Sequence, residues 1–239
     1  MKLKYYIIRQ LLFSIVTLIG LIFITFILAY IIPGDPARLM AGPLAPHEQV
    51  EKIRKELGLD KPLYEQFLLY IERLMHGDLG ISVHTRRPVI DDIKEYFAAT
   101  FELTTVSMVI GLVIGIPVGV ISAFKKDKAT DQLSRLLSLS GVSIPQFWLG
   151  LMLQLIFCSY LGILPSGGRV DYIVFAQNPL RKITGLYLLD SLLSGNFPVF
   201  LNCLQHIVLP AICLSYASLA VITRMLRANM LEVLREDYI

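Results

Sequence analysis

The stretch that decides the fold is Arg224-Met-Leu-Arg-Ala-Asn-Met-Leu-Glu-Val-Leu-Arg-Glu-Asp-Tyr-Ile239. It follows an apolar run long enough to cross a membrane, yet it is itself polar and amphipathic. On a helical wheel one half-circle holds Met225, Leu226, Met230, Val233 and Leu234, and the other half holds Arg224, Arg227, Glu232 and Arg235. A membrane span that continues into such a helix is expected to contact a soluble partner. Because no Gly, Pro or polar tail ends this helix, we expect the sequence to continue beyond Ile239.

The composition is that of an integral membrane protein. Hydrophobic residues make up 55% of the 239 residues, charged residues make up 17%, and the mean hydropathy is +0.63. Soluble domains carry about 25% charged residues. Four segments approach the roughly 20 apolar residues that a spanning helix needs, namely Leu11–Ile32, Leu103–Phe124, Leu136–Tyr160 and Leu204–Ile222. The predicted fold class is therefore all-α, a polytopic helical bundle with about four spanning helices.

The first apolar run is predicted to be a permanent span, residues 1–32, and not a signal peptide. Its apolar core exceeds the usual length of about 7–15 residues, and no small-x-small cleavage site precedes Pro33.

The distribution of charge predicts the topology. The segments 1–9, 125–135 and 224–239 hold ten basic and five acidic residues, whereas 33–102 and 164–206 hold twelve basic and fourteen acidic ones. Short basic flanks of spans face the cytoplasm. We therefore expect a multi-pass protein of the inner or plasma membrane with both termini in the cytoplasm. The net charge of +3 requires no nucleic acid partner.

Residues 33–102 are predicted to form a helical extracytoplasmic cap. Val50, Ile53 and Leu57 share one face of a short helix that ends at Gly58. Asp60 offers an N-cap and Pro62 a first turn for a second helix, which ends before Gly77-Asp-Leu-Gly80. The residues expected to be buried on that helix are Leu63, Phe67, Ile71 and Leu74. Two interpretations fit: the cap only packs on the bundle, or it also frames an external opening.

The second span carries small residues at intervals of four. They are Ser107, Gly111, Gly115, Gly119 and Ala123. Such a stripe lets helix backbones approach closely where lipid supplies no hydrophobic driving force. It fits tight structural packing, and it also fits a sliding contact in a moving transporter. Pro117, beside the stripe, should bend the helix.

The third span is predicted to be kinked at Pro145, which removes one backbone donor in mid-helix. Gln146 and Gln154 would place polar side chains deep within the membrane. Two interpretations fit them, namely interhelical hydrogen bonds and a substrate path. The apolar patch Leu186–Leu193, interrupted by Asp190, is too short to span and is expected at the interface or in a cap.

The sequence lacks the short motifs that mark several kinds of catalytic and nucleotide-binding sites. There is no GxxxxGK[ST] phosphate loop, no HExxH and no GxSxG, and the four histidines are not clustered. Cys158, Cys203 and Cys213 show no CxxC spacing and predict neither a disulfide framework nor a metal site. We expect no catalytic, metal-binding or cofactor-binding residue in this chain.

A series of short motifs, in this order, resembles one known family. The series comprises Pro33-Gly-Asp-Pro36, Gly77-Asp-Leu-Gly80, Ser143-Ile-Pro-Gln-Phe-Trp-Leu-Gly150, Leu164-Pro-Ser-Gly167, Leu188-Leu-Asp…Gly195-Asn196, His206-Ile-Val-Leu-Pro210 and the final stretch from Arg224. Together they are similar to the membrane permease subunit of binding-protein-dependent ABC importers, in the dipeptide, oligopeptide and nickel branch. The resemblance covers the whole chain.

This resemblance implies a type I ABC importer permease fold, with residues 103–239 forming part of the permease core. It implies three kinds of partner: a second homologous permease, two ATP-binding subunits and an extracytoplasmic solute-binding protein. ATP and magnesium would bind in the ATPase subunits, so this chain would be a transport permease and not an enzyme. Glu232, Arg235, Asp237 and Tyr238 match the approach to the cytoplasmic coupling helix that docks on the ATPase.

Family members continue into the coupling loop and two further spans, which are not part of these 239 residues. We therefore expect this chain by itself not to complete a transport pathway. The substrate expected from the resemblance is a di- or oligopeptide. Nickel import by the same architecture and a non-transporting membrane scaffold are the alternatives.

Overall fold

The computed structural model describes residues 3–31, 35–42, 44–82, 84–234 and 236. It divides into two compact units, Met1–Ile93 and Lys94–Ile239, which are described separately. Within the described residues all regular structure is helical, apart from one isolated bridge between Ile81 and Pro88. The all-α prediction is confirmed.

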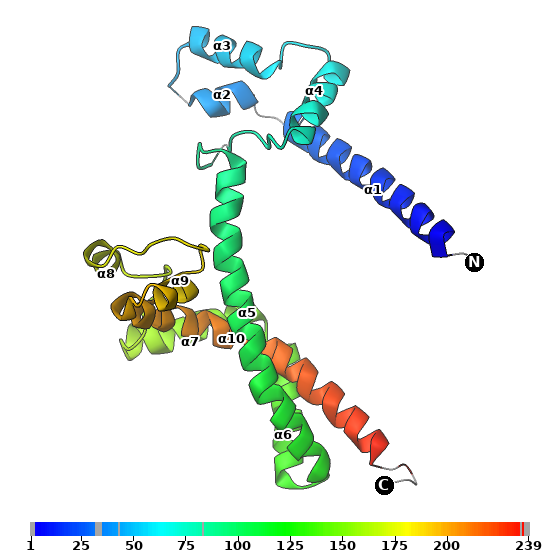
Figure 1. Cartoon of the computed structure of the whole chain (residues 1–239), viewed down its shortest axis with the longest axis vertical. Helices are drawn as coiled ribbons and strands as arrows, with labels where there is room; N and C mark the ends of the chain where they lie inside the picture. Colours follow the sequence, from blue (N-terminus) through cyan, green and yellow to red (C-terminus); the bar gives the residue numbers. More distant parts are fainter. Residues whose placement is uncertain (1–2, 32–34, 43, 83, 235, 237–239) are drawn as a thin grey trace. The chain divides into compact units, whose positions relative to one another are not determined.

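The first unit contains α1 (Leu3–Ile31), α2 (Pro36–Ala41), α3 (His47–Leu57) and α4 (Leu63–Met75) (Figure 1). Phe26 of α1 is buried and packs edge-on against Phe67 of α4, with ring centroids 5.2 Å apart. Helix α3 ends at Gly58, whose φ of 71° is a left-handed conformation that glycine adopts without steric cost. The prediction that this helix ends at Gly58 is confirmed.

The helix predicted after Asp60 is α4, but its cap and its burial differ from the prediction. The residue that precedes the helix is Pro62 and not Asp60. Leu63 is 52% exposed, and none of the residues of α4 is fully buried. The reason is that α4 presents its apolar face to a single helix of this unit, α1, through Phe67 and Tyr70.

Asp35, from the motif that follows the first span, joins α2 to α3. One of its carboxylate oxygens accepts a hydrogen bond from the backbone N–H of Ala37 at 3.1 Å and caps α2. The other oxygen accepts from the guanidinium of Arg54 on α3 at 2.6 Å. Asp35 thereby fixes the angle between two short helices that could not be stable separately.

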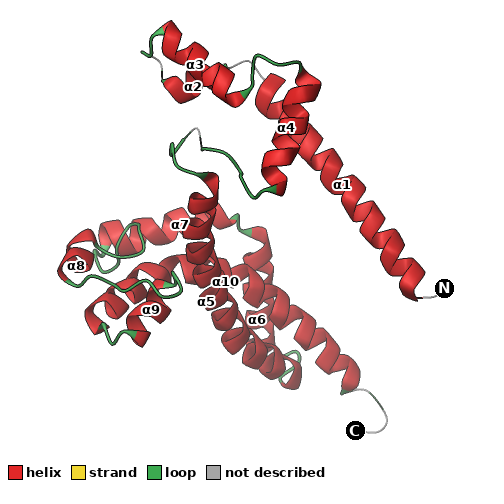
Figure 2. Cartoon of the chain, turned by 45° about the horizontal axis from the view of Figure 1, so that its top comes forward, coloured by secondary structure: helices red, strands yellow, loops and turns green. Residues whose placement is uncertain are grey.

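The second unit is built around two long helices, α5 (Val89–Phe124), which belongs to this unit from Lys94 onward, and α10 (Phe197–Val233). Between them the chain forms α6 (Ala129–Ser143), α7 (Gln146–Gln154), the π-helix η1 (Leu155–Tyr160) and two short helices, α8 (Tyr172–Gln177) and α9 (Tyr187–Leu193). Figure 2 shows how loops connect α8 and α9. Asn196 caps α10 by accepting a hydrogen bond from Val199 N–H, and Pro198 lies in the first turn. This cap explains why α10 begins before the predicted span at Leu204.

Three helices of the described residues are long and apolar enough to cross a membrane. They are Leu3–Leu28, Val89–Phe124 and Phe197–Val233. The helices Ala129–Ser143 and Gln146–Tyr160 would together be a fourth span, but they meet at a bend of 102°.

This bend differs from the single kinked helix predicted over Leu136–Tyr160. Ile144 lies immediately before Pro145, and the proline ring disfavours helical backbone in the residue that precedes it. Ile144 is accordingly extended, with φ −80° and ψ 124°. Pro145 therefore ends α6 and starts α7, whereas α5 continues through Pro117 as one helix.

Helices α6 and α10 approach each other closely at Gly141. A Cβ atom built on Gly141 would lie 2.7 Å from the Cβ of Ala220 and 3.1 Å from the carbonyl oxygen of Tyr216. The hydroxyls of Ser140 and Tyr216 share a hydrogen bond of 2.6 Å at the same place. The absence of a side chain at Gly141 is what allows this approach.

We predict that Gly141→Ala destabilises the protein by about 1–3 kcal/mol, because the added methyl group overpacks the contact. Gly150→Ala is the matched control, since its Cβ would meet only Cys213 Sγ at an ordinary 3.6 Å. Unfolding of both variants in detergent micelles, followed by circular dichroism, measures the difference. Equal stability of the two variants would contradict the packing described here.

Candidate functional site

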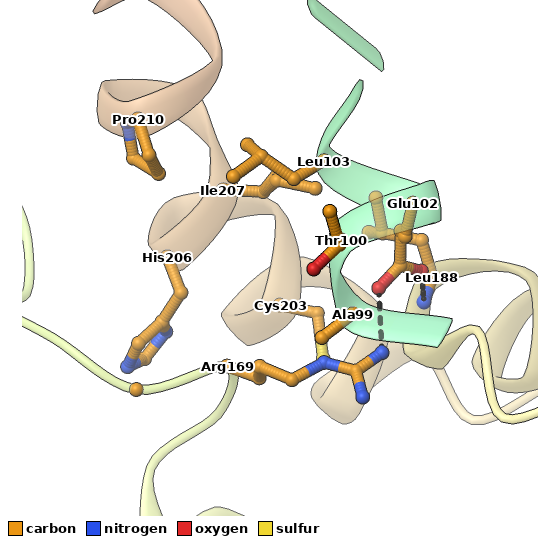
Figure 3. Close-up of a pocket in the computed structure, with 11 residues that line it drawn as sticks. Ala99, Thr100, Glu102, Leu103, Arg169, Leu188, Cys203, His206, Ile207 and Pro210 are labelled. Atoms are coloured by element: carbon orange, nitrogen blue, oxygen red, sulfur yellow. Dashed lines mark hydrogen bonds and ion pairs between the residues drawn. The ribbon is translucent and has the colours of Figure 1, made fainter. Parts of the chain in front are cut away.

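A cavity of about 190 Å³ opens in the second unit between α5, α10 and the loop around Arg169 (Figure 3). Its apolar wall comes from Leu103, Leu188, Ile207 and Pro210, and its polar groups come from Glu102, Arg169 and His206. A second hollow of about 600 Å³ shares Leu103, Gly168, His206 and Pro210 with the first. The two hollows thus adjoin, and His206 lies where they meet. A concave apolar site with a few convergent polar groups is the usual form of a small-molecule site.

Glu102 and Arg169 form a partly buried ion pair at the edge of this cavity. The Arg169 guanidinium donates to Glu102 Oε2 at 2.8 Å and to the carbonyl oxygen of Gly185 at 3.0 Å. It also lies over the ring of Tyr187, 3.7 Å from the centroid. Glu102 Oε1 accepts from the backbone N–H of Leu188 at 2.6 Å. The pair therefore joins the start of the apolar part of α5 to the loop and to α9.

His206 is held by a second polar cluster on the other side of the cavity. Its Nδ1 lies 2.8 Å from the carbonyl oxygen of Asn202, and its Nε2 lies 3.6 Å from Asp171 Oδ1. Asn202 and Asp171 exchange two hydrogen bonds, at 2.8 and 2.7 Å. His206 lies near the start of the predicted span Leu204–Ile222, and in the structure it is a buried residue of α10. Asn202 and His206 are separated by one helical turn, and this spacing is the sequence signal from which their contact could have been predicted.

Asp190 is fully buried and serves as the anchor of the segment before α9. Its carboxylate accepts from the backbone N–H groups of Ile183, Thr184 and Gly185, at 3.1, 2.9 and 3.0 Å. The hydroxyl of Thr184 adds a bond of 2.7 Å. Burial by itself raises the pKa of this carboxyl, but the bonds from Thr184, Ile183 and Gly185 outweigh burial and lower the pKa below its ordinary value. The patch Leu186–Leu193 is thus a short helix fixed by its one acidic residue.

The stripe of small residues on α5 faces α10. Every member is buried, and a Cβ atom on Gly111, Gly115 or Gly119 would lie 3.1–3.4 Å from an atom of α10. The stripe comprises Ser107, Gly111, Gly115, Gly119 and Ala123. The hydroxyl of Thr223 on α10 donates to the carbonyl oxygen of Gly115 at 3.2 Å. The small residues therefore place two backbones in contact, and Pro117 lies on the exposed side of the helix.

A second ion pair, which sequence analysis missed, joins α6 to α10. Both oxygens of Asp131 accept from Arg227, at 2.6 and 2.9 Å, and Asp131 is 0% exposed. Ser122 and the backbone N–H of Asp127 complete the coordination of this carboxylate. The available signal was Asp131, one of two acidic residues in the predominantly basic segment 125–135.

The amphipathic segment continues α10 without a break to Val233, but its faces differ from the predicted wheel. Arg227 was placed on the polar face and instead turns toward Asp131. Met225 and Val233, from the predicted apolar face, are 59% and 43% exposed. The reason is that α6 packs on the side of α10 that bears Ala220 and Arg227. Of the predicted docking residues, Glu232 is exposed in the last turn, and Arg235, Asp237 and Tyr238 lie outside the described residues.

Of the two glutamines of the predicted third span, only Gln154 has a hydrogen bond from its side chain within the described part of the chain. Gln154 donates from Nε2 to the carbonyl oxygen of Ser166 at 2.6 Å. The backbone carbonyl of Gln146 accepts from Cys213 Sγ at 3.4 Å, and its side chain is exposed. Among the described residues, no group of three or more His, Cys, Asp or Glu side chains is arranged to hold a metal ion.

The long apolar helices, the small-residue contacts and the polar cavity together define a polytopic helical membrane protein. Residues 115–239 match the family model described as binding-protein-dependent transport system inner membrane component, and residues 3–104 match the model of its N-terminal region. The chain belongs to this family of transport permeases, whose fold is that of type I ABC permeases.

Individual relatives match almost the entire chain. The probable D,D-dipeptide transport system permease protein DdpB of Escherichia coli K12 is 47% identical over 98% of this chain and 68% of its own length. The dipeptide transport system permease protein DppB of Alkalihalophilus pseudofirmus is 42% identical over 98% of this chain and 69% of its own. The glutathione transport system permease protein GsiC of Escherichia coli is 37% identical over 98% and 66%.

We predict that Glu102→Gln destabilises the protein by about 1–3 kcal/mol, because Arg169, only 27% exposed, loses its carboxylate partner. Unfolding in micelles measures the loss, and the double variant with Arg169→Gln should recover part of it. Lys126→Gln is the control. It removes an exposed pair, with Lys126 Nζ 3.9 Å from Asp127, and should have no measurable effect. Additive losses in the double variant would show that the two side chains do not interact.

A pH prediction follows from the lowered pKa of Asp190. Because its pKa in the folded protein lies below the unfolded value near 3.8, the carboxylate stabilises the fold above that pH. This contribution is lost as the pH falls through the folded pKa. We expect the stability difference between the wild type and Asp190→Asn to be constant near neutral pH and to shrink below about pH 4. Denaturation series at several pH values test this, and a difference that does not change with pH would contradict it.

Proposed function

We propose that this chain is the membrane-spanning subunit of an ABC importer for di- or oligopeptides. The observation that carries the proposal is its 42–47% identity, over 98% of the chain, to proteins named as dipeptide transport permeases. A further relative, at 37% identity, is named as a permease for glutathione, which is itself a peptide. Nickel import, the alternative from the sequence, has no such relative among these proteins.

The cavity supports a role in moving a solute with charges of both signs. A dipeptide carries an ammonium group at one end and a carboxylate at the other. The cavity edge carries Glu102 and Arg169, and His206 stands on its opposite side. We infer that this hollow forms part of the translocation path, where apolar walls and a few charged groups suit peptides of varied side chains.

The proposal includes partners that supply energy and substrate. ATP and magnesium bind in two separate ATPase subunits, and this chain carries no cofactor. A second homologous permease completes the path, and an extracytoplasmic solute-binding protein delivers the peptide. Both ends of the chain face the cytoplasm, as the basic segments 1–9, 125–135 and 224–239 favour. Glu232, with Arg235, Asp237 and Tyr238, approaches the ATPase.

Uptake by the assembled transporter tests the proposal. The permease as its gene encodes it is co-expressed with the second permease and the ATPase subunits of its locus, and is reconstituted in liposomes with the binding protein. We expect uptake of a radiolabelled dipeptide that requires ATP.

An otherwise identical complex whose ATPase subunits cannot hydrolyse ATP is the control, and it should take up none. Uptake of radioactive nickel and not of dipeptides would contradict the proposed substrate. Uptake that persists in the control complex would contradict the proposed mechanism.

A further inference from the structure

A groove of about 340 Å³ lies between α6 and α10, away from the cavity described above. Arg135, Ser134 and Ser138 line it from α6, and Arg224 and Arg227 line it from α10. Three guanidinium groups thus line it from two helices, together with the hydroxyl groups of Ser134, Ser138 and Thr223. The hydroxyls of Ser134 and Thr223 donate within the protein, whereas guanidinium groups and the Ser138 hydroxyl are donors of the kind that recognise a phosphate group.

The groove carries more positive charge than the protein neutralises. Its neighbouring carboxylate, Asp131, is fully buried and already accepts two bonds from Arg227 at 2.6 and 2.9 Å. Arg135 lies 3.6 Å from the same carboxylate, beyond hydrogen-bonding distance, and its side chain is 51% exposed. Arg135 and Arg227 share the single carboxylate of Asp131, and Arg224 adds a third positive charge to the groove, so an anion would balance the site.

The three arginines lie at the boundary between the apolar and polar parts of both helices. On α10 the apolar run ends at Ile222 and Arg224 follows, whereas on α6 Arg135 directly precedes the apolar run from Leu136. Because Arg135 and Arg227 both approach Asp131, the two boundaries lie at the same level. In a membrane this is the level of the lipid headgroups.

Apolar side chains continue the groove on the side away from the basic segments. Leu139 and Val142 of α6 are 63% and 55% exposed, and Val221 of α10 is 39% exposed. On α10, Val221 lies one turn before Arg224, on the same face of the helix. Phosphate ligands at one end and exposed apolar surface at the other match the two parts of a phospholipid.

We propose that this groove binds an anionic phospholipid, with its phosphate held by Arg135 and Arg224 and by the hydroxyl of Ser138. The acyl chains would lie along Leu139, Val142 and Val221. Arg227 serves mainly to fix the groove, because Asp131 already engages it. Basic pockets between membrane helices are known to bind such headgroups. The inference requires that the chain lies in a membrane but not that it transports peptides.

Native mass spectrometry of the whole permease tests the proposal. The purified protein is titrated with phosphatidylglycerol and with phosphatidylcholine of the same chain length. We expect a preference for phosphatidylglycerol, and a loss of that preference of about tenfold or more in Arg135→Gln/Arg224→Gln. Lys126→Gln/Lys128→Gln removes the same charge from the neighbouring loop and should keep the preference. If the double variant does not fold, Arg224→Gln, an exposed position, should still lose several-fold.

Three outcomes would overturn the proposal. The first is an unchanged preference in the arginine variant, and the second is an equal loss in the lysine control. The third is full competition by inorganic phosphate at millimolar concentration, which would indicate a site for free anions and not for lipid.

A photo-crosslinking residue at position 139 distinguishes lipid from protein as the occupant. In the assembled transporter it should capture phospholipid. Capture of an ATPase subunit in its place would show that the groove is a protein interface. Because none of these readouts depends on uptake, failure here is distinct from failure of the proposed function.

Discussion

The close approach of α5 and α6 to α10 is the constraint on which the rest of the second unit depends. Helices in a membrane gain little from the hydrophobic effect when they associate, so dispersion contacts and interhelical hydrogen bonds must supply the free energy. The glycines of α5 and Gly141 of α6 let the backbones come close enough for both. The bond from Thr223 to the carbonyl of Gly115 depends on that proximity. The same two helices line the cavity beside the loop that carries Arg169, α5 with Leu103 and α10 with Ile207 and Pro210.

The segment between η1 and α10 illustrates how a region without long helices is kept in one conformation. Glu102 and Asp190 each accept backbone hydrogen bonds from the segment, and Asp171, which lies within it, accepts from Asn202 of α10. A carboxylate removed from water is costly unless it is paired, and paired carboxylates therefore define a unique arrangement. The polar cavity wall is part of this arrangement, so its shape is determined by the same bonds that hold the segment.

The sequence was sufficient for features that depend on local spacing. The repeat of small residues from Ser107 to Ala123, the helix end at Gly58 and the extension of α10 past Ile222 follow from rules about neighbouring positions. The pairing of Asp131 with Arg227 joins residues 96 positions apart, and a helical wheel assigned Arg227 to the wrong face because it contains no information on which neighbour packs where. Pro145 was recognised, but the wheel and the hydropathy could not show that Ile144 would leave the helical conformation altogether. The ligands of Asp190 are mostly backbone groups, which no residue type reveals.

The break at Pro145 has a mechanical consequence. The backbone ladder of α6 ends with the bond from Ile144 to Ser140, and that of α7 begins with the bond from Leu149 to Pro145. Each helix also rests on α10 at its own place, α6 at Ala220 and α7 at Cys213. Bending stiffness is therefore interrupted between them, and rotation about the backbone of Ile144 can absorb a change in their angle. A displacement of α6 is therefore transmitted to α7 through α10, which both helices contact, and not along the backbone between them.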